Sequence, residues 1–156
     1  MDKYQEKENI GRDTWHNSSF YFARISRSEG TTGKFDRQDE RCTGLTGEKY
    51  LVEIKCYSDP SHPRPYSKFP DYQIDYEKIE NLCDDAQKED RIPLLFVKFD
   101  DCEIVWKPKK NVKTDWRYVN KYGQNYGAEK ERSLQAFLDI KDAIDVTYPQ
   151  DYLLVF

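Results

Sequence analysis

The segment of residues 50–56 places the strongest constraint on the fold, because its side chains alternate in character. At the two-residue period of a β-strand, one face carries Tyr50, Val52, Ile54 and Cys56, and the other carries Leu51, Glu53 and Lys55. We therefore predict a strand whose first face is buried. Glu53 and Lys55 then lie on the same side, roughly 6.5 Å apart along the strand, where a carboxylate and an ammonium group can act on one bound ion.

A second strand is predicted immediately before the first, over residues 35–45. The intervening turn contains a glycine where the backbone needs a positive φ. The resulting hairpin is expected to place Arg41 opposite Glu53 and Asp39 opposite Lys55. Asp39 then becomes a near neighbour of both Glu53 and Lys55.

Asp39 and Glu53 together predict a site for a divalent metal ion. Two adjacent carboxylates repel each other and raise each other's pKa unless a cation lies between them. Their hard oxygen atoms favour Mg²⁺ or Mn²⁺. The alternative interpretation is a solvated Glu53–Lys55 pair on an exposed sheet face, which contributes roughly a few tenths of a kcal/mol to stability.

The order of an aspartate, a hairpin and Glu-x-Lys, followed by a helix and two strands, resembles the PD-(D/E)xK nuclease superfamily. The resemblance is greatest to small stand-alone members found in phage and mobile-element genomes, and it covers about residues 18–107. It implies an α/β (α+β) fold with a restriction-endonuclease-like core, in which a mixed central sheet is flanked by helices. It also implies that Asp39 and Glu53 bind Mg²⁺, that the Ile54 backbone carbonyl adds a ligand, and that Lys55 positions the attacking water.

Two features of the family pattern are missing from this sequence. No proline precedes either Asp36 or Asp39, so both remain candidate ligands, although strand parity and reach to Glu53 favour Asp39. The helix that opens the core in this superfamily, which often contributes an acidic residue to the site, has no clear counterpart. The candidates for that acidic residue are Glu6, Glu8 and Glu29.

Basic and aromatic side chains in three regions predict contacts with nucleic acid. The regions are a proline-rich extended loop over residues 59–70, the start of a helix at 75–88, and a stretch from 107 to 126. Basic groups neutralise phosphates and aromatic rings stack on bases. The candidate nucleic-acid-binding residues are Arg64, Lys68, Lys78, Lys109, Lys110, Lys113, Trp116 and Arg117. The alternative for each of them is an ordinary solvated or core-packed surface residue.

The helix over residues 75–88 is the clearest in the chain, since Asp75 can cap it and an apolar stripe runs along it. That stripe consists of Ile79, Leu82, Cys83 and Ala86. The other segments predict a short helix over 3–9 ended by Gly11, strands over 18–26, 93–99 and 102–106, a long loop over 107–126, and a strand or a helix over 134–140. Four isolated cysteines and two histidines lack zinc-site spacing and predict buried free thiols.

The length and net charge of the chain limit its possible domain organisation and its possible partners. A chain of 156 residues is expected to form one domain, with a nuclease-like core at 18–107 and a basic, aromatic extension at 108–156. Its net charge of −4 argues against a generic nucleic-acid binder. A nuclease tolerates that charge if a local basic face and metal ions offset the phosphates. No signal peptide or membrane span is visible, so the expected location is the cytoplasm, or the host cytoplasm for a phage protein.

Two functions follow from these observations. The first is a Mg²⁺-dependent nuclease that hydrolyses DNA, with Asp39, Glu53 and Lys55 as its catalytic residues. The second is a binding protein that keeps the nuclease scaffold without its chemistry, such as a phage protein that binds a host defence complex or nucleic acid. The expected partners are DNA, a second copy of the chain, as in many small nucleases, and a protein that contacts the apolar C-terminal residues 152–156.

Overall fold

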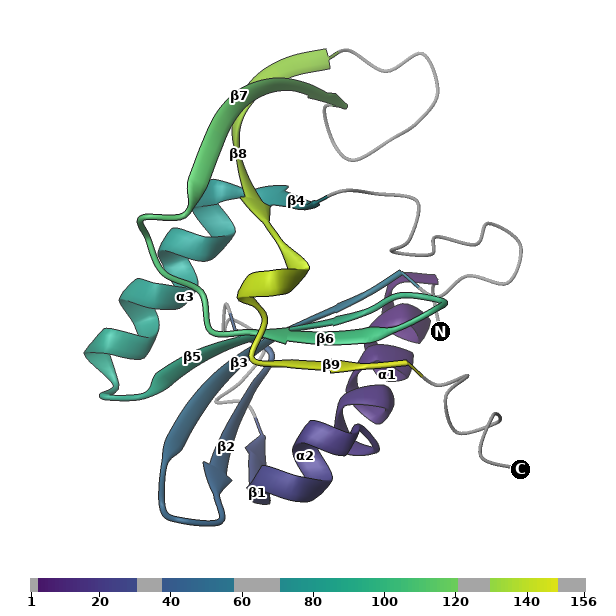
Figure 1. Ribbon diagram of the computed structural model, residues 1–156, viewed down its shortest axis with the longest axis vertical. Helices are drawn as coiled ribbons and strands as arrows, with labels where there is room; N and C mark the ends of the chain where they lie inside the picture. The colour runs from purple at the N-terminus through teal and green to yellow at the C-terminus, as the bar shows by residue number, and fades with distance from the viewer. Residues whose placement is uncertain (1–2, 31–37, 58–70, 121–129, 149–156) are drawn as a thin grey trace.

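The computed structural model describes residues 3–30, 38–57, 71–120 and 130–148, and shows a mixed α+β protein built on a six-stranded sheet (Figure 1). The strand order is β1-β2-β3-β5-β6-β9. Strands β3 and β5 are parallel, and all other neighbouring pairs are antiparallel. The strands are β1 (Ile25–Gly30), β2 (Glu40–Gly44), β3 (Lys49–Cys56), β5 (Ile92–Lys98), β6 (Glu103–Trp106) and β9 (Asp145–Thr147).

Helices cover both faces of this sheet, as Figure 1 shows. Helices α1 (Lys3–His16) and α2 (Ser19–Arg24) lie on one face, and α3 (Tyr76–Lys88) lies on the other. The predicted alternation in β3 explains the two layers. Its Val52 packs in a cluster with Trp15 and Phe20 of the first two helices, whereas Leu51 packs in a cluster with Ile79 and other residues of α3.

A second, three-stranded sheet stands beside α3. Its order is β4-β8-β7, with both pairs antiparallel, and its strands are β4 (Tyr72–Asp75), β8 (Lys130–Leu138) and β7 (Lys113–Asn120). Ile74, Ala136 and Leu138 belong to the same buried cluster as α3. After β8, the 3₁₀ helix η3 (Ile140–Asp142) leads to β9, which returns to the edge of the large sheet. The predicted extension from residue 108 therefore contributes to both sheets.

Several predicted elements are confirmed. The strand at residues 50–56, the helix at 75–88 and the strands at 93–99 and 102–106 are present as β3, α3, β5 and β6. The segment 134–140, for which a strand and a helix were both open, falls mainly in β8. Asp75 occupies the N-cap of α3 but makes no side-chain capping bond. Its carboxylate instead accepts a hydrogen bond from Gln135 Nε2 at 2.5 Å, which fastens β4 to β8.

Three predictions near the N-terminus and in the basic stretch are wrong. The strand predicted over 18–26 is helix α2 followed by β1, because Ser18 caps the helix by accepting a hydrogen bond from Tyr21 N at 3.2 Å. The helix predicted over 3–9 is present, but it does not end at Gly11 and continues to His16. Gly11 instead allows the helix to approach β3 closely, because a Cβ at this position would lie 3.1 Å from Ile54 Cγ2. The loop predicted over 107–126 contains strand β7, which pairs with β8 along its whole length.

A buried carboxylate fastens α1 to the sheet. Glu40 on β2 is only 1% exposed. It accepts hydrogen bonds from Trp15 Nε1 at 2.7 Å and His16 Nε2 at 2.5 Å, both at the end of α1. The Cys42 thiol donates a third bond at 2.9 Å. The carboxylate is thus fully engaged inside the protein, where an unpartnered charge would be strongly destabilising.

We predict that Glu40→Ala lowers the free energy of unfolding by about 3 kcal/mol, because it leaves the buried Trp15 indole N–H without an acceptor and removes the partner of the partly exposed His16. Urea denaturation measures the change. Glu80→Ala, an exposed position on α3, is the control and should stay within about 0.5 kcal/mol of the wild type. Equal stability of the two variants would show that Glu40 does not hold α1 in place.

Candidate active site

The β2–β3 hairpin brings the three predicted catalytic residues together. Glu53 and Lys55 share the face of β3 that is turned toward α3, and Lys55 Nζ lies 3.2 Å from Glu53 Oε1. Asp39 immediately precedes β2. Its Oδ2 accepts a hydrogen bond from Ile54 N at 2.7 Å, and its own N–H donates to Val52 O at 3.1 Å.

The register of the hairpin differs from the predicted one by two residues. Arg41 pairs with Leu51 rather than with Glu53. The turn is tighter than expected, since Gly44 N donates to Glu48 O at 2.7 Å and Gly47 adopts a φ of +90°. Asp39 consequently lies closer to Glu53 than the predicted register allowed.

Glu53 is a buried carboxylate with a strongly perturbed pKa. Its pKa is raised to about 7, first by burial, then by the neighbouring Asp39 carboxylate and the hydrogen bond between the two side chains, while Lys55 acts in the opposite direction. Burial lowers the pKa of Lys55, but attraction to Glu53 outweighs that effect and raises it. Near neutral pH the lysine is therefore protonated, and Glu53 lies close to the midpoint between its protonated and ionised forms.

Two tyrosines that the sequence analysis missed lie beside this group. The hydroxyls of Tyr57 and Tyr72 are 2.9 Å apart. The Tyr57 hydroxyl interacts electrostatically with Lys55, and Glu53 contributes to the raised pKa of Tyr72, whose main cause is burial. The sequence could have pointed to Tyr57, because this residue follows Leu51, Glu53 and Lys55 at the two-residue period of a strand. Tyr72 comes from β4, and no local pattern pointed to it.

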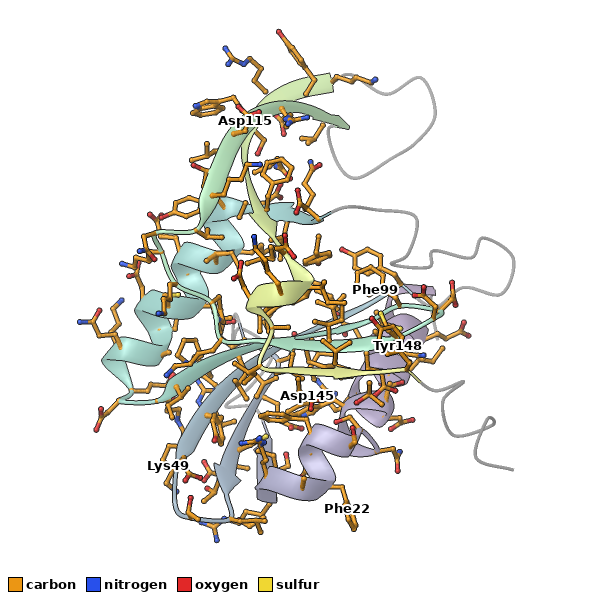
Figure 2. The ribbon with its side chains drawn as sticks, viewed as in Figure 1. Phe22, Lys49, Phe99, Asp115, Asp145 and Tyr148 are labelled. Atoms are coloured by element: carbon orange, nitrogen blue, oxygen red, sulfur yellow. The ribbon has the colours of Figure 1, made fainter. Side chains whose placement is uncertain are left out.

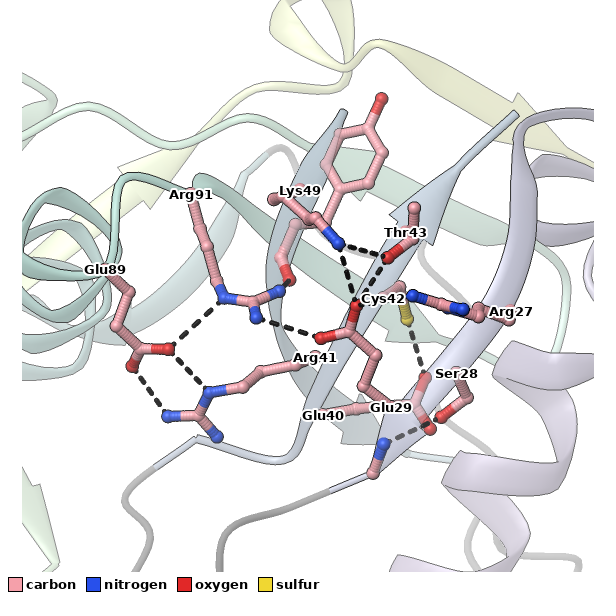
Figure 3. Close-up of polar contacts among 12 residues, drawn as sticks. Arg27, Ser28, Glu29, Glu40, Arg41, Cys42, Thr43, Lys49, Glu89 and Arg91 are labelled. Atoms are coloured by element: carbon pink, nitrogen blue, oxygen red, sulfur yellow. Dashed lines mark hydrogen bonds and ion pairs between the residues drawn. The ribbon is translucent and has the colours of Figure 1, made fainter. Parts of the chain in front are cut away.

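Glu29, one of the candidate acidic residues, belongs to a different cluster, drawn in Figure 3. It accepts hydrogen bonds from Thr43 Oγ1 at 2.5 Å, Arg91 at 2.9 Å and Lys49 at 3.2 Å. Those from Thr43 and Arg91 are the main reasons why its pKa falls to about 2. Glu89 joins the same cluster by binding Arg91 at 3.2 Å and both ends of the Arg41 guanidinium at 2.6 Å. Glu29 thus ties the edge strand β1 to its neighbours.

The remaining predicted site residues are distributed over other parts of the structure. Glu6 and Glu8 are exposed on α1. Lys78 is exposed on α3, and Lys110 forms an ion pair with Asp84 of that helix. Lys109 is exposed in the connection from β6 to β7. Lys113, Trp116 and Arg117 lie on β7 of the second sheet. Asp36, Arg64 and Lys68 fall outside the described residues.

The donor set at the hairpin fits a hard divalent cation. Mg²⁺ is usually held by one or two carboxylates, several waters and substrate phosphates, and Asp39 and Glu53 provide two adjacent carboxylates. Within the described ranges, no group of three or more His, Cys, Asp and Glu side chains is arranged to hold a metal. The Asp39–Glu53 pair supplies only two carboxylates, so a cation there would need water, substrate oxygens or the predicted Ile54 carbonyl to complete its coordination.

No protein-family model, curated protein or solved structure matches this chain. None of the helices in the described part of the chain is long and apolar enough to cross a membrane. The functional interpretation therefore depends on the geometry of the hairpin and on the chemistry of its side chains.

The raised pKa of Glu53 leads to a prediction for the metal-free protein. Because the folded state binds a proton up to about pH 7 and the unfolded state only up to about 4.5, stability falls as the pH rises through that window. Glu53→Gln removes this loss. The free energy of unfolding of the variant, minus that of the wild type, should therefore be about 2 kcal/mol larger at pH 8 than at pH 5, with EDTA present at both values.

Urea denaturation at the two pH values measures this difference. Glu80→Gln changes an exposed glutamate of α3 and should show the same small effect at both values. If the gain of Glu53→Gln is likewise independent of pH, then Glu53 does not titrate abnormally in the folded protein.

Proposed function

We propose that this protein is a metal-dependent nuclease that hydrolyses DNA phosphodiester bonds at Asp39, Glu53 and Lys55. The observation that carries the proposal is the buried Glu53 carboxylate beside the partly buried Asp39 carboxylate, with a lysine ammonium 3.2 Å from Glu53. Glu53 is only 7% exposed, so it differs from a solvated surface glutamate. Buried titratable groups with perturbed pKa values, gathered on adjacent strands, are typical of functional sites.

The order of the elements supports the same proposal. Helix α1 precedes the antiparallel strands β1, β2 and β3, and α3 leads to β5, which runs parallel to β3. If α2 is left out, together with β4, which belongs to the second sheet, the elements follow the α-β-β-β-α-β order expected of a restriction-endonuclease-like core. Asp39 then lies just before the second strand and Glu-x-Lys lies on the third, and we assign α1 to the opening helix for which the sequence showed no counterpart.

Each side chain of the site has a distinct role in the proposed reaction. Asp39 and Glu53 hold Mg²⁺ or Mn²⁺, together with the Ile54 carbonyl. When bound, the ion polarises the phosphate and lowers the pKa of a coordinated water. Lys55 remains protonated at neutral pH because its pKa is raised. It therefore acts as a hydrogen-bond donor that orients the attacking water and stabilises developing negative charge, and not as a base.

The alternative function is a binding protein on the same scaffold, such as a phage protein that binds a host defence complex or nucleic acid. The net charge of −4 favours this alternative, because it opposes close approach to DNA without a metal ion. Cleavage and metal binding distinguish the two functions.

We predict that the wild type cleaves DNA with Mg²⁺ or Mn²⁺ and not with EDTA. Plasmid, linear and single-stranded DNA are the substrates. Glu53→Gln and Lys55→Ala should each reduce the cleavage rate by at least about 100-fold, since each removes a group that acts on the reacting atoms. Lys88→Ala, at an exposed position on α3, tests for a general charge effect, and circular dichroism confirms folding. Cleavage retained by both site variants would exclude this mechanism.

We also predict that Mn²⁺ raises the thermal unfolding temperature of the wild type and that Asp39→Asn removes this response. The cation binds the folded state only, so saturation stabilises it. Asp142→Asn changes an exposed carboxylate on η3 and should respond like the wild type. A folded wild type that does not respond to Mn²⁺ would support the binding protein over the nuclease.

A further inference from the structure

The outer part of the second sheet is a two-stranded ribbon, which we call the β7–β8 arm and define as residues 116–119 and 130–134. Strand β4 pairs with β8 only from Gln135 to Leu138. Beyond Gln135, β8 continues in register with β7 as far as the pair of Lys130 and Asn120. Figure 1 shows this part of the ribbon extending away from α3 and from the large sheet. An isolated two-stranded ribbon is marginally stable in water, so an extended arm of this kind suggests a binding role.

One face of the arm is an exposed continuation of the core. Ala136 and Leu138 of β8 are buried against α3. Side chains at the same parity farther out belong to Leu134 and Arg132, which pair with Trp116 and Tyr118 of β7. Trp116 is 54% exposed and Tyr118 is 72% exposed. Two large aromatic rings thus lie on one face of β7, two residues and roughly 7 Å apart along the strand.

The arm is also the basic part of the second sheet. The arm carries three cationic side chains, Arg117, Lys130 and Arg132, and one carboxylate, Glu131, within a chain of net charge −4. Figure 2 shows side chains on both sides of the ribbon around Asp115, which immediately precedes the arm on β7. The Arg132 guanidinium lies 5.6 Å from the centre of the Trp116 ring. This cation–π contact places a positive charge beside the indole ring of the arm.

We infer that the β7–β8 arm binds single-stranded DNA, with Trp116 and Tyr118 stacking on bases and Arg132 and Lys130 neutralising phosphates. Flat aromatic faces beside cationic groups suit unpaired bases, whose π-faces are accessible, and do not suit a duplex, whose base faces are stacked. The spacing of the two rings equals about two base-stacking intervals of 3.4 Å. The inference depends on the proposed function only in taking DNA as the substrate, because binding at the arm requires neither the metal nor Asp39.

Fluorescence anisotropy in EDTA tests this inference without cleavage. The probes are a labelled oligothymidylate and a duplex of equal length. The wild type should bind the single strand at least about 10-fold more tightly than the duplex. Trp116→Ala and Tyr118→Ala should each weaken single-strand binding by roughly 5- to 150-fold, the range for losing one stacked base. Trp116→Phe should restore most of the binding, and circular dichroism verifies the fold of each variant.

Phe22→Ala provides a matched control, since Phe22 is a large aromatic residue that is 88% exposed on α2, remote in sequence from the arm. It should bind DNA like the wild type. Arg132→Gln should reduce the slope of log affinity against log salt by about one. Binding within twofold of the wild type for both Trp116→Ala and Tyr118→Ala, or tighter binding of the duplex, overturns the inference. If the wild type self-associates and these variants lose self-association but keep DNA binding, the arm binds a second copy of the chain, and the inference is overturned as well.

The same variants separate this inference from the proposed nuclease activity. If the arm variants lose single-strand binding while the wild type cleaves no DNA with Mg²⁺ or Mn²⁺, the arm inference stands and the nuclease proposal fails. If Asp39→Asn abolishes cleavage and the arm variants bind normally, the nuclease proposal stands and the arm inference fails.

Discussion

The hydrogen bond from the Ile54 N–H to the Asp39 carboxylate is the interaction on which the candidate site depends. At 2.7 Å it holds a side chain from the start of β2 against the middle of β3. Because Ile54 lies between Glu53 and Lys55, this bond places the Asp39 carboxylate next to both of them. The resulting repulsion contributes to raising the pKa of Glu53. A hairpin held in another register would separate the carboxylates and remove the reason to expect a cation between them.

Two buried glutamates on adjacent strands differ in how the protein compensates their charge. Glu40 faces α1 and accepts three hydrogen bonds, from Trp15, His16 and Cys42. Glu53 faces the opposite side, where its neighbours are the Lys55 ammonium and a second carboxylate. The first arrangement satisfies the charge with protein donors and fastens a helix. The second leaves a carboxylate pair whose charge is only partly balanced, which is the condition that favours a bound cation.

The sequence predicted the elements with strong periodicity and missed those determined by tertiary contacts. Alternation in residues 50–56 gave β3 and the Glu53–Lys55 pair, and the stripe containing Ile79 gave α3. Residues 20–22, which are aromatic, favour a strand by propensity, yet the Ser18 cap and the burial of Phe20 make them helical. The arm lacks apolar alternation because both of its faces are exposed at the outer end, so its strand signal was weak.

Strand β8 connects the arm to the tyrosines that lie beside the candidate active site. It runs from Arg132 in the arm to Leu138, which pairs with Tyr72 of β4. The hydroxyl of Tyr72 in turn lies 2.9 Å from that of Tyr57, next to Lys55. The six residue steps from Arg132 to Leu138 span about 20 Å of strand, the length of about six stacked nucleotides at 3.4 Å each. A single strand bound as we infer would therefore lie on the sheet that also carries Tyr72, whose hydroxyl contacts that of Tyr57.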